Sequence, residues 1–262
     1  KALAPKIPAD RVIISESGIS SHQQVLTLAP FVDGFLVGSS LMAQPDIDLA
    51  CRALIYGNTK ICGLTTNEHA QASATAGAIY GGLIFAKKSP RYVDLASAMA
   101  IRHQVNLQFV GVFVHEDIEL VADYARQLNL AVVQLHGNEA PDYIDQLRQA
   151  LPTDCKIWLA VRSDQLNDIT ACDNVDRLLI DSAVTTDHTT EFGGTGQSFD
   201  WEQVPSDIRG DAMLAGGLAP DNIMTAVRSG FYGLDVNSGL ESSPGVKDLA
   251  KIKQLSQQLR NY

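Results

Sequence analysis

The sequence predicts an α/β protein with a (β/α)8 barrel over residues 60–262, preceded by an incomplete β-α-β-α piece over residues 1–56. Short, nearly continuous apolar runs alternate with helical patterns eight times after residue 60. That alternation is typical of parallel strands covered on the outside by helices. About 200 residues is the lower size limit for eight such units in a closed barrel. The first piece has only two strands, which cannot close a barrel, so we expect the tail of a longer domain.

The elements expected in residues 1–56 follow from their apolar patterns and turn residues. In order they are a strand at 11–15, a turn at 16–18, a helix at 20–28, a strand at 34–37 and a helix at 47–56. Gly57-Asn58-Thr59 contains residue types that favour turns, so residues 57–59 are expected to form a linker.

The barrel elements are justified in the same way. The eight strands are expected at 60–65, 79–85, 109–114, 131–135, 156–160, 177–181, 212–215 and 233–236. The helices are expected at 68–76, 93–104, 117–128, 140–150, near 165–171, at Trp201, at 221–228 and at 247–260. Because active sites of this fold lie at the C-terminal ends of the strands, the residues at these ends are the candidates for function.

Composition excludes several classes of partner. The formal net charge of -10 would repel a phosphate backbone, so no nucleic-acid partner is expected. No apolar run approaches the ~20 residues of a membrane span, and the first residues lack a secretory pattern, so we expect a cytoplasmic protein. The four cysteines are widely spaced and the histidines lack ligand spacing, so no metal and no disulfide framework are expected.

Cys62 stands at the end of the first barrel strand. The residues that follow, Thr65, Thr66 and Asn67, are types found at helix N-caps. A thiol in this place can be accessible to solvent and close to helix-terminal N–H groups that favour the thiolate. Alternatively, Cys62 is a small buried hydrophobic residue, the usual environment of free cysteine.

Two glycine turns follow the seventh and eighth strands. Gly216-Gly217 precedes a helix expected to open at Pro220-Asp221, and Ser238-Gly239 follows the neighbouring strand. Backbone N–H groups in such turns bind phosphate, and this pair of loops is the usual phosphate site of the fold. Alternatively, the glycines only permit tight turns.

Three further side chains stand at strand ends, each with a structural alternative. Asp181 ends the sixth strand and is either a functional carboxylate or a turn residue. Arg91 follows the second strand and suits a substrate carboxylate bidentately, unless it is a surface charge. His136 follows the fourth strand and is either functional or a structural imidazole. The long loop of residues 192–201 is typical of a lid, with its glycines at Gly193, Gly194 and Gly196.

Six ordered motifs in residues 60–262 closely resemble the phosphoribosylanthranilate isomerase family of tryptophan biosynthesis. They are Lys60-Ile61-Cys62-Gly63-Leu64-Thr65, Ser89-Pro90-Arg91, Gln134-Leu135-His136-Gly137, residues 193–201, Leu214-Ala215-Gly216-Gly217-Leu218 and residues 235–241. The resemblance implies an Amadori rearrangement of a phosphorylated anthranilate-derived substrate, without cofactor or metal.

The resemblance also implies roles for the residues at the strand ends. Asp181 would be the general acid and Cys62, as thiolate, the general base. Arg91 would hold the anthranilate carboxylate, with His136 and Asp235 also at the substrate. The phosphate contacts would be Gly216, Gly217, Ser238 and Gly239, and the glycine-rich loop would close over the site.

Residues 1–56 resemble the last two βα units of the indole-3-glycerol-phosphate synthase barrel. The motifs are Ile14-Ser15-Glu16-Ser17-Gly18-Ile19 and residues 34–42. The catalytic lysine and glutamate of that decarboxylating lyase come from earlier strands, so only the phosphate-site residues Gly18, Gly38 and Ser39 and the glutamate-serine pair Glu16-Ser17 would remain. The resemblance implies the C-terminal part of a bifunctional enzyme with an upstream synthase domain in the parent chain.

Two other functions fit a barrel of this kind. A non-catalytic phosphate-ligand-binding barrel would use Cys62 only as a structural residue. A Schiff-base aldolase would want a lysine at an inward strand end, where the sixth strand carries Asp181 instead.

Overall fold

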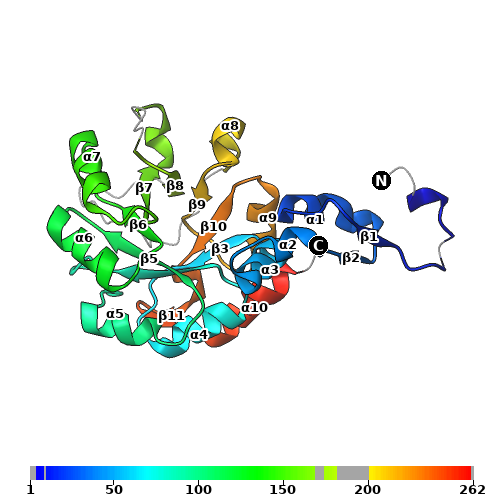
Figure 1. The fold of residues 1–262 in the computed structure, drawn as a ribbon, viewed down its shortest axis with the longest axis horizontal. Coiled ribbons are helices and arrows are strands. Elements are labelled where there is room, and N and C mark those ends of the chain that lie inside the picture. Colours follow the sequence, from blue (N-terminus) through cyan, green and yellow to red (C-terminus); the bar gives the residue numbers. More distant parts are fainter. Residues whose placement is uncertain (1–3, 9, 169–173, 182–200, 261–262) are drawn as a thin grey trace.

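The computed structural model describes residues 4–8, 10–168, 174–181 and 201–260. Its central feature is a closed barrel of eight parallel strands, in the order β10-β3-β4-β5-β6-β7-β8-β9 (Figure 1). The strands are β3 Asn58–Ile61, β4 Tyr80–Ile84, β5 Gln108–Phe113, β6 Val132–Leu135, β7 Lys156–Arg162, β8 Arg177–Asp181, β9 Met213–Leu214 and β10 Gly233–Val236. The predicted fold class is therefore confirmed, and consecutive strands are neighbours all round the barrel.

Helices surround this barrel and connect its strands (Figure 1). The α-helices are α4 Asn67–Thr75, α5 Leu95–Arg102, α6 Ile118–Gln127, α7 Pro141–Ala150, α8 Ser206–Arg209, α9 Ile223–Arg228 and α10 Leu249–Leu259. The 3-10 helices of this region are Ser163–Asp168, Trp201–Gln203 and Ser238–Leu240. Several begin at a side-chain cap: Thr66 accepts from the His69 N–H and Asp94 from the Ser97 N–H.

The apolar core has two parts because strand side chains alternate between the two faces of the barrel wall. Inside the barrel, Tyr80, Val110, Trp158, Leu179 and Met213 belong to one buried cluster. A larger cluster fills the space between the strands and the helices and includes Ile61, Leu135, Ile144, Leu147 and Leu255. On each strand, residues two positions away from a member of the first cluster therefore also point into the barrel.

The barrel begins two residues earlier than expected. Asn58 and Thr59, which we expected in a linker, are the first residues of β3 and pair with Gly233 and Leu234. Pairing with β10 satisfies their backbone groups, which outweighs the turn preference of Asn and Gly in this segment. The linker expected at residues 57–59 is thus wrong for two of its three residues.

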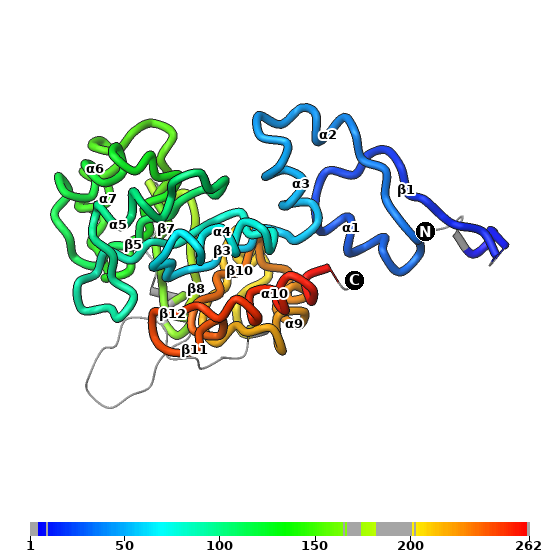
Figure 2. The backbone as a smooth tube through the Cα atoms, turned by 90° about the horizontal axis from the view of Figure 1, so that it is seen from below, coloured from blue at the N-terminus to red at the C-terminus, as the bar shows by residue number. Residues whose placement is uncertain are grey.

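The N-terminal segment lies to one side of the barrel (Figures 1 and 2). It consists of η1 Ala4–Lys6, β1 Ile14–Glu16, α1 His22–Leu28, η2 Ala29–Phe31, β2 Gly34–Leu36, α2 Ser39–Met42 and α3 Ile47–Tyr56. β1 and β2 form a parallel two-stranded sheet. Val12, Leu36 and Met42 are exposed by 76%, 62% and 70%, so this segment buries little apolar surface by itself.

Helix α3 joins this segment to the barrel. Leu49 and Ala53 pack against the cluster inside the barrel, and Arg52 Nη1 donates to the carbonyl oxygens of Asn106 at 2.8 Å and Ala78 at 3.3 Å. These carbonyls precede β4 and β5, so α3 covers the N-terminal end of the barrel. None of the helices among the described residues has the length and apolar character needed to cross a membrane.

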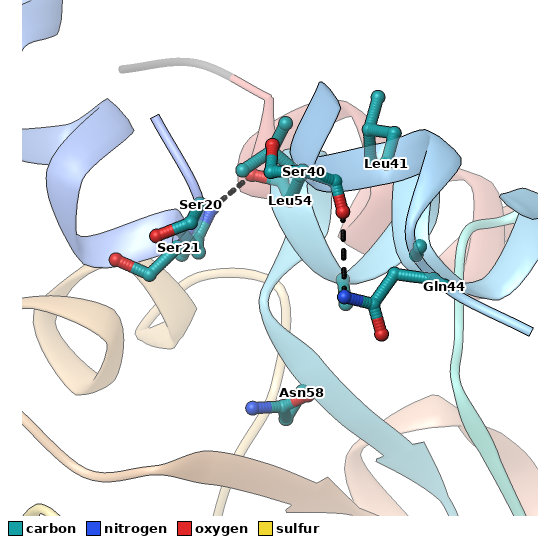
Figure 3. Close-up of a pocket in the computed structure, with 10 residues that line it drawn as sticks. Ser20, Ser21, Ser40, Leu41, Gln44, Leu54 and Asn58 are labelled. Atoms are coloured by element: carbon teal, nitrogen blue, oxygen red, sulfur yellow. Dashed lines mark hydrogen bonds between the residues drawn. The ribbon is translucent and has the colours of Figure 1, made fainter. Parts of the chain in front are cut away.

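A cavity of about 270 Å³ lies between α1, α2, α3 and the start of β3 (Figure 3). Its wall includes Ser21, Ser40, Gln44, Leu54 and Asn58. Because Asn58 is the first residue of β3, the cavity is at the N-terminal end of the barrel. It is therefore separate from the C-terminal ends of the barrel strands, where Cys62, His136 and Asp181 stand.

Hydrogen exchange is expected to be fastest in the N-terminal segment. The amides of β1 and β2 should exchange at least about tenfold faster than those of β5, because few buried apolar contacts protect them. Amides of α3 should be intermediate, since this helix is anchored on the barrel. Mass-spectrometric exchange of the whole chain would measure this, and protection in β1 equal to that in β5 would contradict it.

Candidate active site

Two layers of polar side chains point into the barrel near the C-terminal ends of its strands. Lys60 on β3, Gln134 on β6 and Asp235 on β10 form the deeper layer and are buried. Cys62, His136 and Asp181 each follow an inward-facing residue by two positions, at or one residue past the ends of β3, β6 and β8, so they form the layer above. The structure therefore brings the candidate thiol, imidazole and carboxylate to one end of the barrel.

Cys62 is buried inside the barrel, with only 4% of its surface exposed. Its N–H donates to the Val236 carbonyl at 2.9 Å, and its side chain packs with Ile84 and Val112. Burial raises the pKa of the Cys62 thiol, and the ammonium of Lys60 opposes that shift. Of the two environments considered for Cys62, the structure shows the buried one, and Lys60 supplies the charge that favours the thiolate.

Gly82 on β4 makes room for this thiol. A Cβ at this position would lie 2.6 Å from Cys62 Sγ and 2.9 Å from Cys62 Cα. Real Cβ contacts are not that close, so any larger residue would displace the thiol or the strand. The glycine therefore fixes how closely Cys62 packs against β4.

Lys60 is fully buried and paired. Its Nζ donates to Asp235 Oδ2 at 2.7 Å and to Gln134 Oε1 at 2.9 Å. Burial lowers the pKa of Lys60, but the Asp235 carboxylate outweighs it, so the pKa lies above its usual value and the ammonium stays charged. Sequence reasoning assigned Asp235 to the substrate site but gave Lys60 no role.

His136 lies beside Asp181, with 3.8 Å between His136 Nε2 and Asp181 Oδ2. Burial lowers the pKa of His136, and the Asp181 carboxyl opposes the shift without reversing it. The imidazole is therefore neutral near pH 7, because its usual pKa is already about 6.5. His136 Nδ1 is 3.2 Å from Gln134 Nε2, which links it to the deeper layer.

Arg91 is held by a carboxylate that sequence reasoning missed. Its Nε donates to Glu241 Oε1 and its Nη2 donates to Glu241 Oε2, both at 2.8 Å. Lys247 Nζ donates to Glu241 Oε1 at 2.9 Å and to Asn237 Oδ1 at 2.8 Å. One edge of the guanidinium, which we expected to clamp a substrate carboxylate, is thus already occupied.

A β-hairpin brings Glu241 and Lys247 together. Its strands are β11 Glu241–Ser243 and β12 Val246–Lys247, and it follows β10 at the mouth of the barrel. Thr65 Oγ1 donates to the Gly245 carbonyl at 2.8 Å, which ties the hairpin to the segment after Cys62. Pro244-Gly245 is a turn signal that could have revealed this hairpin in the sequence.

The two glycine turns meet beside this site. Gly216 and Gly217 have φ of 84° and 62°, a conformation that favours glycine. A Cβ on Gly239 would collide with the Leu218 carbonyl, so the turn after β10 lies directly against the turn after β9. No acceptor among the described residues takes the N–H groups of Gly216, Gly217, Ser238 or Gly239. These groups are available to an anion.

Asn222 braces the first of these turns. Its Oδ1 accepts from the Ala219 N–H at 2.9 Å, and its Nδ2 donates to the Gly217 carbonyl at 2.8 Å. Helix α9 begins only at Ile223, so the expectation that it opens at Pro220-Asp221 is wrong. Asn222 satisfies the turn through its side chain, which leaves residues 220–222 outside the helix.

The expected lid glycines, Gly193, Gly194 and Gly196, lie outside the described residues. In the N-terminal segment, Gly18 has φ of 73°, and Ser40 Oγ donates at 2.7 Å to the Ile19 carbonyl. The turns after β1 and β2, which carry Gly18, Gly38 and Ser39, are therefore adjacent.

These features define a (β/α)8-barrel protein whose strand ends carry a carboxyl group, a thiol and two adjacent glycine turns. Comparison gives the family: the model for N-(5'phosphoribosyl)anthranilate (PRA) isomerase matches residues 59–258. The model for indole-3-glycerol phosphate synthase matches residues 1–54. The chain belongs to the phosphoribosylanthranilate isomerase family, with a fragment of the synthase family at its N-terminus.

Individual relatives agree with this assignment. The chain is 48% identical over 262 residues to the tryptophan biosynthesis protein TrpCF of Yersinia pestis, covering all of this chain and 54% of the relative. The corresponding protein of Vibrio cholerae is also 48% identical, and 55% of it is covered. The chain thus spans about half the length of these curated relatives.

Solved isomerases share the barrel. A phosphoribosylanthranilate isomerase from Thermotoga maritima superimposes with a TM-score of 0.66 at 30% identity, over 78% of this chain and 99% of that one. The isomerase from Thermus thermophilus superimposes with a TM-score of 0.64 at 28% identity, over 78% of this chain and 98% of that one.

Proposed function

We propose that this chain converts N-(5'-phosphoribosyl)anthranilate to 1-(2-carboxyphenylamino)-1-deoxyribulose 5-phosphate by an acid/base Amadori rearrangement. One observation carries the proposal: Cys62 and Asp181 both point inward at the C-terminal ends of their strands, beside two glycine turns whose N–H groups have no acceptor among the described residues. Membership of the isomerase family gives the substrate. No cofactor or metal is needed for the reaction.

The reaction moves two protons without net oxidation. Asp181 donates a proton to the furanose ring oxygen, the C1'–O bond breaks, and the nitrogen lone pair forms an iminium. The Cys62 thiolate then removes the C2' proton, whose electron pair neutralises the iminium and gives an enolamine. Protonation of this enolamine at C1', with loss of the proton from its C2' hydroxyl, gives the ketose product. General acid–base steps of this kind typically contribute 10²–10⁴-fold each.

The charges around Cys62 suit the second step. A thiol must lose its proton to act as a base, and burial raises the pKa of Cys62. The buried ammonium of Lys60 partly offsets this, so turnover should rise as the pH increases toward the pKa of the thiol. The neutral imidazole of His136 beside Asp181 can donate a hydrogen bond to the carboxylate that remains after proton transfer.

The remaining contacts bind the two ends of the substrate. Gly216, Gly217, Ser238 and Gly239 hold the phosphate through their N–H groups. Arg91 contacts the anthranilate carboxylate through the part of its guanidinium that Glu241 leaves free, and His136 and Asp235 lie between the two ends. A related isomerase has been solved in complex with a reduced 1-(o-carboxyphenylamino)-1-deoxyribulose 5-phosphate, which supports a substrate of this size and charge. Gly193, Gly194 and Gly196 belong to the proposed lid.

Asp181→Asn is expected to lower turnover by at least about 10²-fold and to leave the affinity for the reduced product analogue nearly unchanged. Asparagine keeps the shape of the side chain but cannot give up a proton to the ring oxygen. The loss of substrate fluorescence measures turnover, with Asp164→Asn on the exposed 3-10 helix as the matched control. Turnover of Asp181→Asn at the unmodified rate would remove its role as acid.

Asn222→Ala is expected to raise KM for the phosphorylated substrate about tenfold with little change in kcat. Two hydrogen bonds that shape the Gly216-Gly217 turn are lost, each worth about 0.5–1.5 kcal/mol. Asn174→Ala is the control, because its side chain donates to Asp145 Oδ1 before the start of β8, at the opposite end of the barrel from the glycine turns. An equal KM in both variants would contradict the phosphate site.

Two alternatives predict different outcomes. A non-catalytic phosphate-binding barrel would bind the reduced analogue and show no turnover in the same assay. A Schiff-base aldolase would need a neutral lysine at the site, and Lys60 points inward, but its ammonium is paired with Asp235 and stays charged. A chain that forms a borohydride-trapped adduct on Lys60 would favour the aldolase.

The N-terminal part is assigned by the same reasoning. We propose residues 1–56 as the C-terminal fragment of a synthase barrel and residues 58–262 as the isomerase barrel. Synthase activity would belong only to a longer parent chain with the upstream part of that domain. Gly18, Gly38 and Ser39 are then the remains of its phosphate site. The expected cytoplasmic location and the absence of a nucleic-acid partner stay predictions.

A further inference from the structure

Lys60 occupies an unusual place for a lysine. It stands in the apolar strand β3, has no exposed surface, and makes hydrogen bonds to groups on two other strands. Lysine is almost never fully buried unless it is paired, because removing an ammonium from water is unfavourable. Its charge lies inside the barrel, directly below Cys62.

The first contact of Lys60 is with Cys62. The two residues are two positions apart on β3 and share its inward face. Both approach the same point above Gly82, where a Cβ would lie 2.6 Å from Cys62 Sγ and 3.1 Å from Lys60 Cε. The charged groups that face the thiol are Lys60 and Asp235 from below and Lys247 and Arg91 from the mouth. Lys60 is the foremost of the cations that favour the thiolate.

The second contact runs through Gln134. Lys60 donates to Gln134 Oε1, so the amide nitrogen of Gln134 faces His136 Nδ1 at 3.2 Å. An amide NH₂ only donates hydrogen bonds, so Nδ1 must accept and the proton of the neutral ring must be on Nε2. That Nε2–H faces Asp181 Oδ2.

We propose that Lys60 is a positioning residue for both reacting groups, since its ammonium holds the Cys62 thiolate and, through Gln134, sets the His136 tautomer that faces Asp181. The inference rests on the proposed function of Cys62 and Asp181. It assigns Asp235 a matching role, because this carboxylate keeps Lys60 charged and aligned. One buried ammonium thus couples the base on β3 to the acid on β8.

Titration of the Cys62 thiolate by its ultraviolet absorbance tests the first contact. Each protein is measured against its own Cys62→Ser counterpart, so that the other cysteines and the tyrosines cancel. Lys60→Met is expected to raise the apparent pKa of Cys62 by about one unit or more. Lys156→Met, which removes an exposed lysine at the start of β7, should leave it unchanged.

Because Lys60→Met leaves the Asp235 carboxylate buried and unpaired, this variant can fail to fold. The double variant Lys60→Met/Asp235→Asn removes that unpaired charge and should show a smaller rise in the same direction. A rise in either variant supports the proposal. An unchanged Cys62 pKa in every variant that folds, the double variant included, overturns it.

The ¹⁵N shifts of the His136 ring nitrogens test the second contact. The unmodified chain should show the Nε2–H tautomer, and Lys60→Met/Asp235→Asn should show a mixture of both tautomers because Gln134 can then turn its amide. An Nδ1–H tautomer in the unmodified chain, or no change in the double variant, overturns this part. Neither measurement requires turnover. A chain that gives both expected results but no turnover would therefore contradict the proposed isomerase function and still support the contacts assigned to Lys60.

Discussion

Cys62→Ala is expected to lower turnover at least about 10²-fold while the affinity for the reduced product analogue stays within a few fold. The substitution removes the group that takes the C2' proton. It leaves the phosphate turns after β9 and β10 in place, and it empties only a small volume between Ile84 and Val112. Steady-state loss of substrate fluorescence gives kcat, and calorimetry gives the analogue affinity.

The matched control for this variant is Cys155→Ala. Cys155 is also a buried cysteine, but it precedes β7 at the opposite end of the barrel and belongs to the helix-facing core. It should lose some stability and keep its turnover. Equal turnover in Cys62→Ala and Cys155→Ala would remove the proposed base and leave the thiol as a packing residue.

Glu241→Ala is expected to lower the free energy of unfolding by about 3–5 kcal/mol. The carboxylate is buried between the Arg91 guanidinium and the Lys247 ammonium, so its removal leaves two buried cations facing each other. Urea denaturation would measure the loss. Asp164→Ala is the control, because its ion pair with Arg162 is exposed and should contribute no more than about 1 kcal/mol.

Lowering the pH should weaken the same contact of Glu241 with Arg91 and Lys247. Burial raises the pKa of Glu241, but the hydrogen bond from Arg91 and the charge of Lys247 outweigh it, so the pKa lies below its usual value. A carboxyl with a lowered folded-state pKa stabilises the fold above its unfolded pKa and loses that contribution as the pH falls through the folded one. The unmodified chain should therefore lose more stability than Glu241→Ala as the pH falls from about 5 to below the usual glutamate pKa of about 4.3. Parallel losses in the two proteins would contradict this.

The sequence alone was sufficient to predict the barrel, because each strand is a short apolar run between turn residues. Strands β8 and β10 have the bounds expected, since Arg177 and Asp181 limit the first apolar run, and Gly233 and the turn residue Asn237 limit the second. The start of β3 was missed because Gly57 and Asn58 favour turns, and Asn58 becomes a strand residue through pairing with β10.

The strand-end positions of Cys62, His136 and Asp181 could also be predicted, because a period of two along each strand decides which side chains point inward. The environment of the thiol could not. It depends on Asp235 and Lys247, which come from β10 and from the hairpin after it, and local sequence says nothing about their distance from one sulfur atom. The partner of Arg91 was missed for the same reason, since Glu241 is 150 positions away.

A crystal structure of this chain with the reduced product analogue would test the central claim most directly. We predict the phosphate at the N–H groups of Gly216, Gly217, Ser238 and Gly239, with C2' of the analogue next to Cys62 Sγ and its O4' next to the Asp181 carboxyl. An analogue bound elsewhere, or bound there with either of these two side chains turned away from the sugar, would contradict the account.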